Sequence, residues 1–120
     1  MTLIVSILVA IVAVLHVGFL VLEMFYWDRP FGRKTFHTTP EFSKASAVLA
    51  ANQGLYNGFL AAGLIWGLLH PTAGFGFQIK VFFLLCVIVA GVYGAVSVSQ
   101  RILLVQAAPA ALALTLLWLS

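Results

Sequence analysis

Long uncharged runs separated by one polar segment form the dominant pattern along the chain. Four runs contain no Asp, Glu, Lys or Arg, at residues 1–22, 45–79, 81–100 and 102–120. Each reaches the length of about 18 to 20 apolar residues that a helix needs to cross a ~30 Å hydrocarbon core. The pattern therefore predicts an all-α fold, a bundle of four transmembrane helices forming a single integral membrane domain over residues 1–120. The expected helices are residues 3–27, 46–69, 78–98 and 102–119.

The segment 28–45 is the one substantial polar connection between these helices. Near its end, Thr39 resembles an N-cap, Pro40 suits the first helical position, and Glu41 places an acidic group in the first turn. The second helix is therefore expected to begin in water before it enters the lipid. His70 and Pro71 predict its end, and residues 72–77 predict a short glycine-containing hairpin.

The composition supports a membrane location and argues against several other classes. The chain is 63% hydrophobic and only 8% charged, so it has too little polar surface for an ordinary water-soluble domain. Its net charge of +3 is concentrated near one loop, which favours a topology signal over a nucleic-acid partner. The single Cys86 excludes an intramolecular disulfide. Motifs for metal binding, nucleotide binding or hydrolysis are absent, so nothing in the sequence indicates an enzyme, and any cofactor is unknown.

The distribution of positive charge predicts an orientation. The first loop and the third loop hold most of the cationic side chains, whereas the opposite side has only Lys80. By the positive-inside rule, loop 28–45 is expected to be cytoplasmic and both termini to lie outside. Trp27, Tyr26, Trp66 and Trp118 then fall near the two interfaces and are expected to be belt residues.

Polar residues within the predicted spans are the candidate functional groups. From the rise of about 1.5 Å per residue, several of them share one level in the inner half of the membrane. This expected layer consists of Glu23, Asn52, Gln53, Tyr56, Tyr93 and Gln106, with His16 and Asn57 above it. Glu23 follows His16 by seven residues, so both lie on one face of the first helix. The layer predicts a site for ligand binding or proton exchange.

Each of these groups also has a structural interpretation. Asn52, Gln53, Asn57 and Gln106 are expected to join helices by hydrogen bonds worth about 0.6 to 2 kcal/mol each in a membrane. Gly54 and Gly58 have the GxxxG spacing that lets another helix approach closely, and Gly63 and Gly67 repeat it. For Glu23 the alternative is a hydrated position at the interface, paired with Arg29 or Arg33.

Four sequence motifs give the chain a family resemblance. They are H-x6-E-M-F-x-W at residues 16–27, RPFGRKTF at 29–36, LAANQGLYNGFLAAGLIWGL at 49–68 and VIVAGVYGA at 87–95. Together they resemble the small bacterial membrane proteins of the Domain of Unknown Function 1304 family, over essentially the whole chain. The resemblance implies a four-helix protein of the inner membrane and no established function. The residues that match the family pattern are His16, Glu23, Trp27, Asn52, Gln53, Tyr56 and Asn57.

Two functional hypotheses of different classes follow. The first is a small protein, expected as a homodimer in the lipid bilayer, that binds or transports an unidentified small amphipathic or cationic ligand in a cavity lined by Glu23, Asn52, Tyr56 and His16. The second is a scaffold or assembly partner whose polar layer only fixes helix packing and is closed and fully paired. A third hypothesis is a quinone- or haem-linked redox component that uses His16 or Tyr93.

Overall fold

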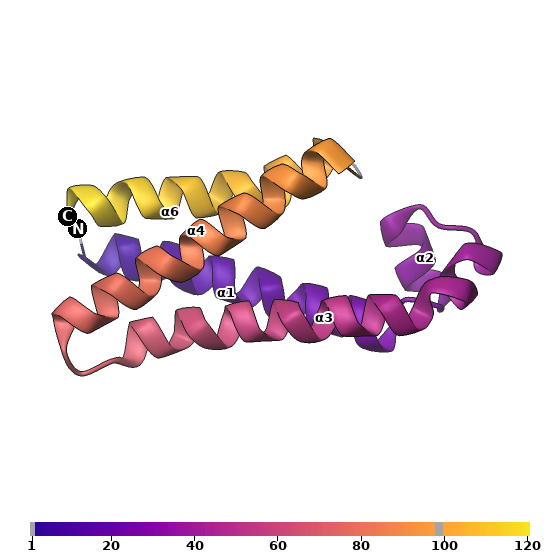
Figure 1. Cartoon of the computed structure of the whole chain (residues 1–120), viewed down its shortest axis with the longest axis horizontal. Helices are drawn as coiled ribbons and strands as arrows, with labels where there is room; N and C mark the ends of the chain where they lie inside the picture. Colours follow the sequence, from indigo (N-terminus) through magenta and orange to yellow (C-terminus); the bar gives the residue numbers. More distant parts are fainter. Residues whose placement is uncertain (1, 98–99) are drawn as a thin grey trace. The chain divides into compact units, whose positions relative to one another are not determined.

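The computed structural model describes residues 2–97 and 100–120, and these are helical apart from short connections. In chain order the elements are α1 (Thr2–Phe25), α2 (Pro30–Phe36), α3 (Pro40–Leu69), α4 (Ala73–Ser97), α5 (Gln100–Ile102), the π-helix η1 (Leu103–Ala107) and α6 (Ala108–Leu119) (Figure 1). The all-α prediction is confirmed for this part of the chain. Contacts divide it into a larger unit, Met1–Leu15 with Leu60–Ser120, and a smaller unit, His16–Phe59, which are described separately.

Three of the described helices are long and apolar enough to cross a membrane, whereas the sequence predicted four. They cover Leu3–Phe25, Ala73–Ser97 and Gln100–Leu119. With 30 residues, α3 is the longest helix, but it is not among the three. Its amide side chains, including Asn52, Gln53 and Asn57, lower its mean hydropathy.

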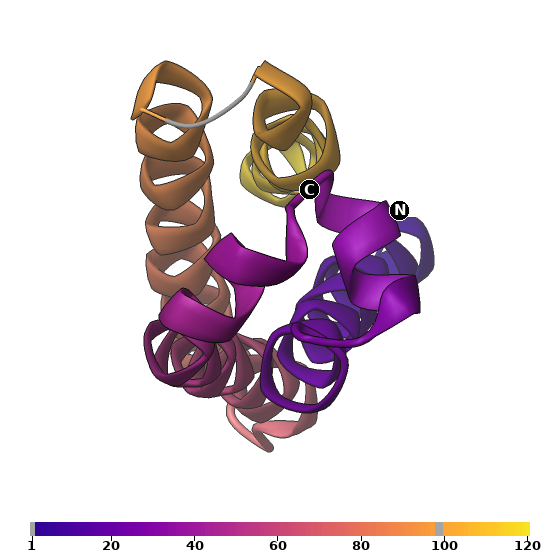
Figure 2. The ribbon, with the colours of Figure 1, turned by 90° about the vertical axis from the view of Figure 1, so that its right-hand side faces the viewer.

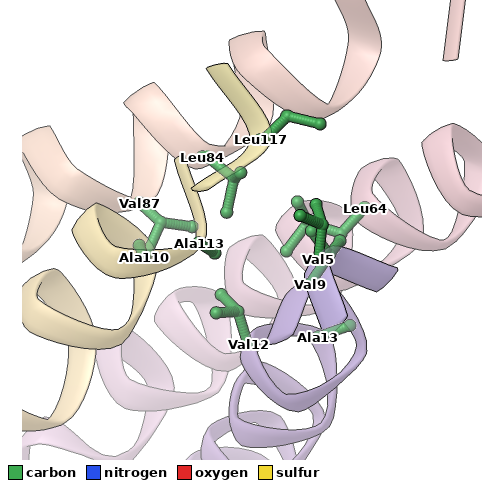
Figure 3. Packing of buried hydrophobic residues seen from close by; sticks show 10 residues of the cluster. All are labelled: Val5, Val9, Val12, Ala13, Leu64, Leu84, Val87, Ala110, Ala113 and Leu117. Atoms are coloured by element: carbon green, nitrogen blue, oxygen red, sulfur yellow. The ribbon is translucent and has the colours of Figure 1, made fainter. Parts of the chain in front are cut away.

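The core of the larger unit is built from small aliphatic side chains of four helices (Figure 3). The members of this cluster are Val5, Val9, Val12 and Ala13 of α1, Leu64 of α3, Leu84 and Val87 of α4, and Ala110, Ala113 and Leu117 of α6. Valine and alanine dominate, so the helix backbones come close together. In lipid such packing contributes mainly van der Waals contact, because lipid tails are as apolar as the side chains.

Glycines bring α4 against its neighbours in the larger unit. A Cβ atom at Gly91 would lie 2.7 Å from Cβ of Ala107 and 2.8 Å from its backbone nitrogen. One at Gly63 of α3 would overlap the ring of Phe83, and one at Gly67 would lie 2.7 Å from Cγ of Lys80. The expectation that Gly63 and Gly67 permit close approach is therefore confirmed.

The last helical region is not one regular helix, contrary to the prediction for residues 102–119. The π-helical turn of η1 immediately precedes α6, which has Pro109 in its first turn. Proline has no backbone N–H, and in a regular α-helix its ring would clash with the carbonyl four residues earlier, at Val105. A wider turn at this point removes the clash, which explains the interruption.

The N-cap and the end of α3 were predicted correctly, but the predicted start of its span at residue 46 is too late. The helix begins at Pro40 rather than at residue 46, and the backbone N–H of Phe42 donates to Oγ1 of Thr39 over 3.2 Å, as expected of the N-cap. It ends at Leu69, before His70, as predicted. The hairpin predicted for residues 72–77 is wrong, because α4 already begins at Ala73.

The polar segment 28–45 contains a helix that was not predicted. Figure 2 shows this segment as a short helix, α2, which follows α1 and precedes α3 along the chain. Pro30 occupies its first turn, and His37 ends it in the left-handed conformation, at φ 56° and ψ 45°. The backbone N–H of Thr38 donates to the carbonyl of Arg33 over 3.0 Å, which is typical of a helix C-terminus.

Candidate functional site

In the smaller unit, two glycines bring α3 against the second half of α1. A Cβ atom at Gly54 would lie 2.7 Å from Cγ of Met24, 3.1 Å from Cβ of Glu23 and 3.2 Å from the carbonyl oxygen of Leu20. One at Gly58 would lie 2.6 Å from Cδ1 of Leu20. The predicted role of the Gly54–Gly58 spacing is confirmed. Of the side chains between these glycines, Leu55 and Tyr56 are exposed, whereas Asn57 is buried.

Asn57 lies on this glycine face and binds Glu23. Its Nδ2 donates to Oε1 of Glu23 over 2.5 Å. Asn57 is only 6% exposed, and Glu23 is half-buried. The depth estimate had placed Asn52 and Gln53, rather than Asn57, at the level of Glu23. The actual partner lies about one helical turn further along α3, because the glycine contacts set the register of the two helices.

The partner of Glu23 is electrically neutral. The arrangement in which Arg33 balances Glu23 is not found, because Nη1 of Arg33 lies 3.1 Å from Oδ1 of Asp28. The Glu23 carboxyl group on α1 is thus held by the Asn57 amide and by helix packing, and no cation of the described residues forms a salt bridge with it.

His16 occupies an interior position in the smaller unit. Its side chain is fully buried, and its ring meets Phe19 edge-on, with centroids 5.3 Å apart and planes at 74°. The His16 side chain interacts with other residues of the chain and is not exposed to solvent. Like Glu23, it belongs to the second half of α1.

Three further predicted site residues of the smaller unit are not buried beside Glu23. Asn52, Gln53 and Tyr56 are exposed, Tyr56 by 54%. They share one side of α3, since residues three and four apart on a helix are neighbours. Tyr93 and Gln106 belong to the larger unit, where Tyr93 is 74% exposed and Gln106 is half-buried in η1.

A surface hollow of about 480 Å³ lies in the smaller unit, at the end of α1. It is lined by Val21, Phe25, Tyr26 and Arg29, so it includes none of the residues expected around a ligand cavity. Sequence reasoning missed this group because Tyr26 was interpreted only as a belt residue. The sequence feature that could have indicated the hollow is Arg29, which lies four residues after Phe25, the apolar end of the first span.

The described residues contain no cluster of three or more His, Cys, Asp or Glu side chains that could hold a metal ion. Glu23 and Asn57 alone supply too few ligands for a closed site of a divalent ion, which usually takes six or more oxygens as calcium or four ligands as zinc. The pair is instead suited to exchanging a proton or to pairing with an organic cation.

Comparison with known proteins assigns the chain to a family. The family model described as "Protein of unknown function (DUF1304)" matches residues 10–118. The chain is also 31% identical over 116 residues to "Uncharacterized protein YpaA" of Lactococcus lactis subsp. lactis (strain IL1403), covering 95% of this chain and 96% of that protein. No solved structure matches. The chain therefore belongs to the DUF1304 family of proteins of unknown function, as its motifs indicated.

Proposed function

We propose that this chain is an integral membrane protein that binds a small amphipathic or cationic ligand through Glu23 and moves it across the bilayer. The observation that carries the proposal is the Glu23–Asn57 pair, in which a carboxyl group within a candidate span has a neutral partner. A charged group costs about 2.5 to 3.5 kcal/mol on insertion scales at the centre of a span, and less at Glu23, which lies close to the end of the span Leu3–Phe25. A glutamine would bond to Asn57 without this cost, so the acid implies a task that needs ionisation.

Ionisation gives the site two states in one position. When protonated, Glu23 is compatible with the apolar surroundings of the span; when ionised, it attracts a cation. A cationic ligand with apolar groups would supply the missing charge and remain soluble in the membrane interior. Exchange of a proton for such a ligand is the simplest reaction that the pair supports.

In this proposal α3 is the fourth membrane span, and two copies of the chain complete the site. The exposed amides of Asn52 and Gln53 would be costly against lipid but can bind each other across a dimer interface, since an amide both donates and accepts. The polar side chains on this side of α3 continue from Asn52 and Gln53 to Tyr56 and towards the buried Asn57. A partner chain on this side would bring further polar groups near Glu23.

The proposed topology follows from the charges. Arg29, Arg33, Lys34 and Lys44 flank or lie in α2 and the start of α3. We place this segment in the cytoplasm and both termini outside, in the inner membrane of a bacterial cell. Labelling of single cysteines at Thr35 and Ser120 with a membrane-impermeant reagent in intact cells tests this orientation, and only position 120 should react.

Binding of tetraphenylphosphonium, a lipophilic cation, tests the function directly. Purified protein in nanodiscs is titrated by calorimetry, comparing wild type with Glu23→Gln and the matched control Glu41→Gln. Glu41 is an exposed carboxylate in the first turn of α3. We expect Glu23→Gln to weaken binding about tenfold or more, as loss of a charge-assisted contact does, and Glu41→Gln to leave it unchanged. Equal affinity in all three proteins would refute a cation site at Glu23.

A second candidate is a scaffold or assembly partner, in which the pair only fixes the packing of α1 on α3. The close contacts of Gly54 and Gly58 with α1 support this candidate. So does the hydrogen bonding of buried polar groups, because within the described residues no buried side-chain N or O atom lacks a partner. A protein of this class would bind no cation, and Glu23→Gln would retain its assembly. The titration above separates the two candidates.

The redox hypothesis makes a different prediction about His16 and Tyr93. A haem or quinone bound near either residue would give the purified protein visible or near-ultraviolet absorption that is lost on substitution. The absorption spectrum of protein purified from its native membrane, with His16→Leu and Tyr93→Phe beside it, tests this hypothesis.

A further inference from the structure

The hollow at the end of α1 combines an apolar wall with a polar rim. Val21 and Phe25 form the wall and are 37% and 61% exposed. Tyr26 and Arg29 complete the lining. Because Phe25 is the last residue of the candidate span and Arg29 follows four residues later, the lining changes from lipid depth to the level of the headgroups.

Residues next to the lining of the hollow in sequence are held by contacts with α2 and α3. Gly32 of α2 packs directly on the backbone carbonyl of Tyr26, where a Cβ atom would collide. Nε1 of Trp27 donates to Oγ of Ser46 over 3.1 Å, and its ring packs 5.0 Å from that of Phe36. Trp27 thus holds the elbow between α1 and α2 on the side of α3. The Tyr26 ring packs at its edge on Phe31, at 6.2 Å.

Arg29 is a cation with no counter-ion in the described part of the chain. The nearby acid, Asp28, is paired with Arg33 at 3.1 Å. Neither the guanidinium of Arg29 nor the hydroxyl of Tyr26 has a hydrogen-bond partner among these residues. Arginine donates two parallel hydrogen bonds to a phosphate, and tyrosine can add a third.

We propose that this hollow binds an anionic phospholipid of the bilayer. The phosphate lies against Arg29 and the Tyr26 hydroxyl, and an acyl chain lies along Val21 and Phe25. A zwitterionic lipid fits less well, because its own ammonium group competes with Arg29 for the phosphate. The site is separate from the Glu23–Asn57 pair, and it stands whether or not a cation is transported.

Native mass spectrometry of the detergent-purified protein tests this site. The protein is titrated with phosphatidylglycerol or phosphatidylcholine, and bound lipid is counted for wild type, Arg29→Gln, Arg29→Lys and Lys34→Gln. Lys34 is an exposed cation of α2 that is not part of the hollow, so its loss removes the same charge elsewhere. We expect wild type to prefer phosphatidylglycerol, Arg29→Gln to weaken that binding about tenfold, and Lys34→Gln to leave it nearly unchanged. Arg29→Lys should fall between, since it keeps the charge but loses the paired hydrogen bonds.

Three results would overturn the proposal. Equal weakening by Arg29→Gln and Lys34→Gln would mean general attraction to positive charge rather than a site. Equal binding of the two lipids would remove the charge argument. If millimolar inorganic phosphate competed for the site as well as the lipid does, the site would bind only the phosphate group and would not use the apolar wall.

A second experiment tests the apolar wall: Phe25→Ala should weaken lipid binding, whereas Phe42→Ala, at another exposed phenylalanine, should not. Circular dichroism of each variant confirms that its helices are intact.

Discussion

The Nδ2 amide of Asn57 donates a hydrogen bond to the Glu23 carboxyl group, and this bond joins α3 to α1 across 34 residues of sequence. It lies beside the contacts of Gly54 and Gly58, where the two helices are closest. The glycines bring the backbones together, and the polar pair then selects one register, because a shift along the helix would leave both polar groups without a partner in an apolar region.

Replacing Asn57 tests this view of the pair. Asn57→Leu leaves the Glu23 carboxyl group without its partner, so it should lower the free energy of unfolding by about 1 to 3 kcal/mol. The same substitution at the exposed Asn52 should change it by less than about 0.5 kcal/mol. Unfolding in mixed micelles, followed by circular dichroism at one chain per micelle, measures both. Equal effects would show that the bond adds nothing to stability.

Glycine substitutions test the close approach of the helices. Gly54→Ala places a methyl group against the Leu20 carbonyl and the Met24 side chain, and it should destabilise the protein by about 1 to 3 kcal/mol. Gly18→Ala is the control, because nothing lies within 4 Å of its Cβ position. It should be neutral or stabilising by up to about 1 kcal/mol, since alanine favours the helix. The contact would be contradicted if the two variants had the same unfolding midpoint.

Trp27 and Trp66 should differ in their importance for the fold. Trp27→Phe removes the hydrogen bond to Ser46 at the α1–α2 elbow and should cost about 1 kcal/mol of stability. Trp66 is 57% exposed, and Trp66→Phe should have little effect in detergent. Thermal unfolding of the two variants is the measurement, and a larger loss at position 66 would show that Trp27 does not hold the elbow.

Cross-linking tests the proposed dimer face. In a Cys86→Ser background, Gln53→Cys should form a disulfide between two chains on mild oxidation in native membranes. Leu55→Cys lies on the same helix and is also exposed, but it points about 160° away around the axis and should stay monomeric. Non-reducing electrophoresis reads out the result. Cross-linking at position 55 alone would place the dimer interface on another face of α3.

Local signals in the sequence were sufficient for several features. Thr39 and Pro40 identified the start of α3, although the predicted span began six residues later. Gly54 and Gly58 identified a packing face, and this is where α1 lies. The short helix α2 was missed because Pro30, at its start, and His37, at its end, stand in a charged segment that resembles a loop.

The sequence by itself determined the helical class, three of the four predicted apolar spans, and the presence of an acid on α1 and amides on α3. These features depend only on the order of apolar, polar, proline and glycine residues along the chain. The choice of Asn57 rather than Asn52 or Gln53 as the partner of Glu23 was decided by tertiary structure. So was the exposure of Tyr56. Each depends on the register and rotation of one helix against another, and a register is set by contacts between residues far apart in sequence, which helical periodicity alone does not contain.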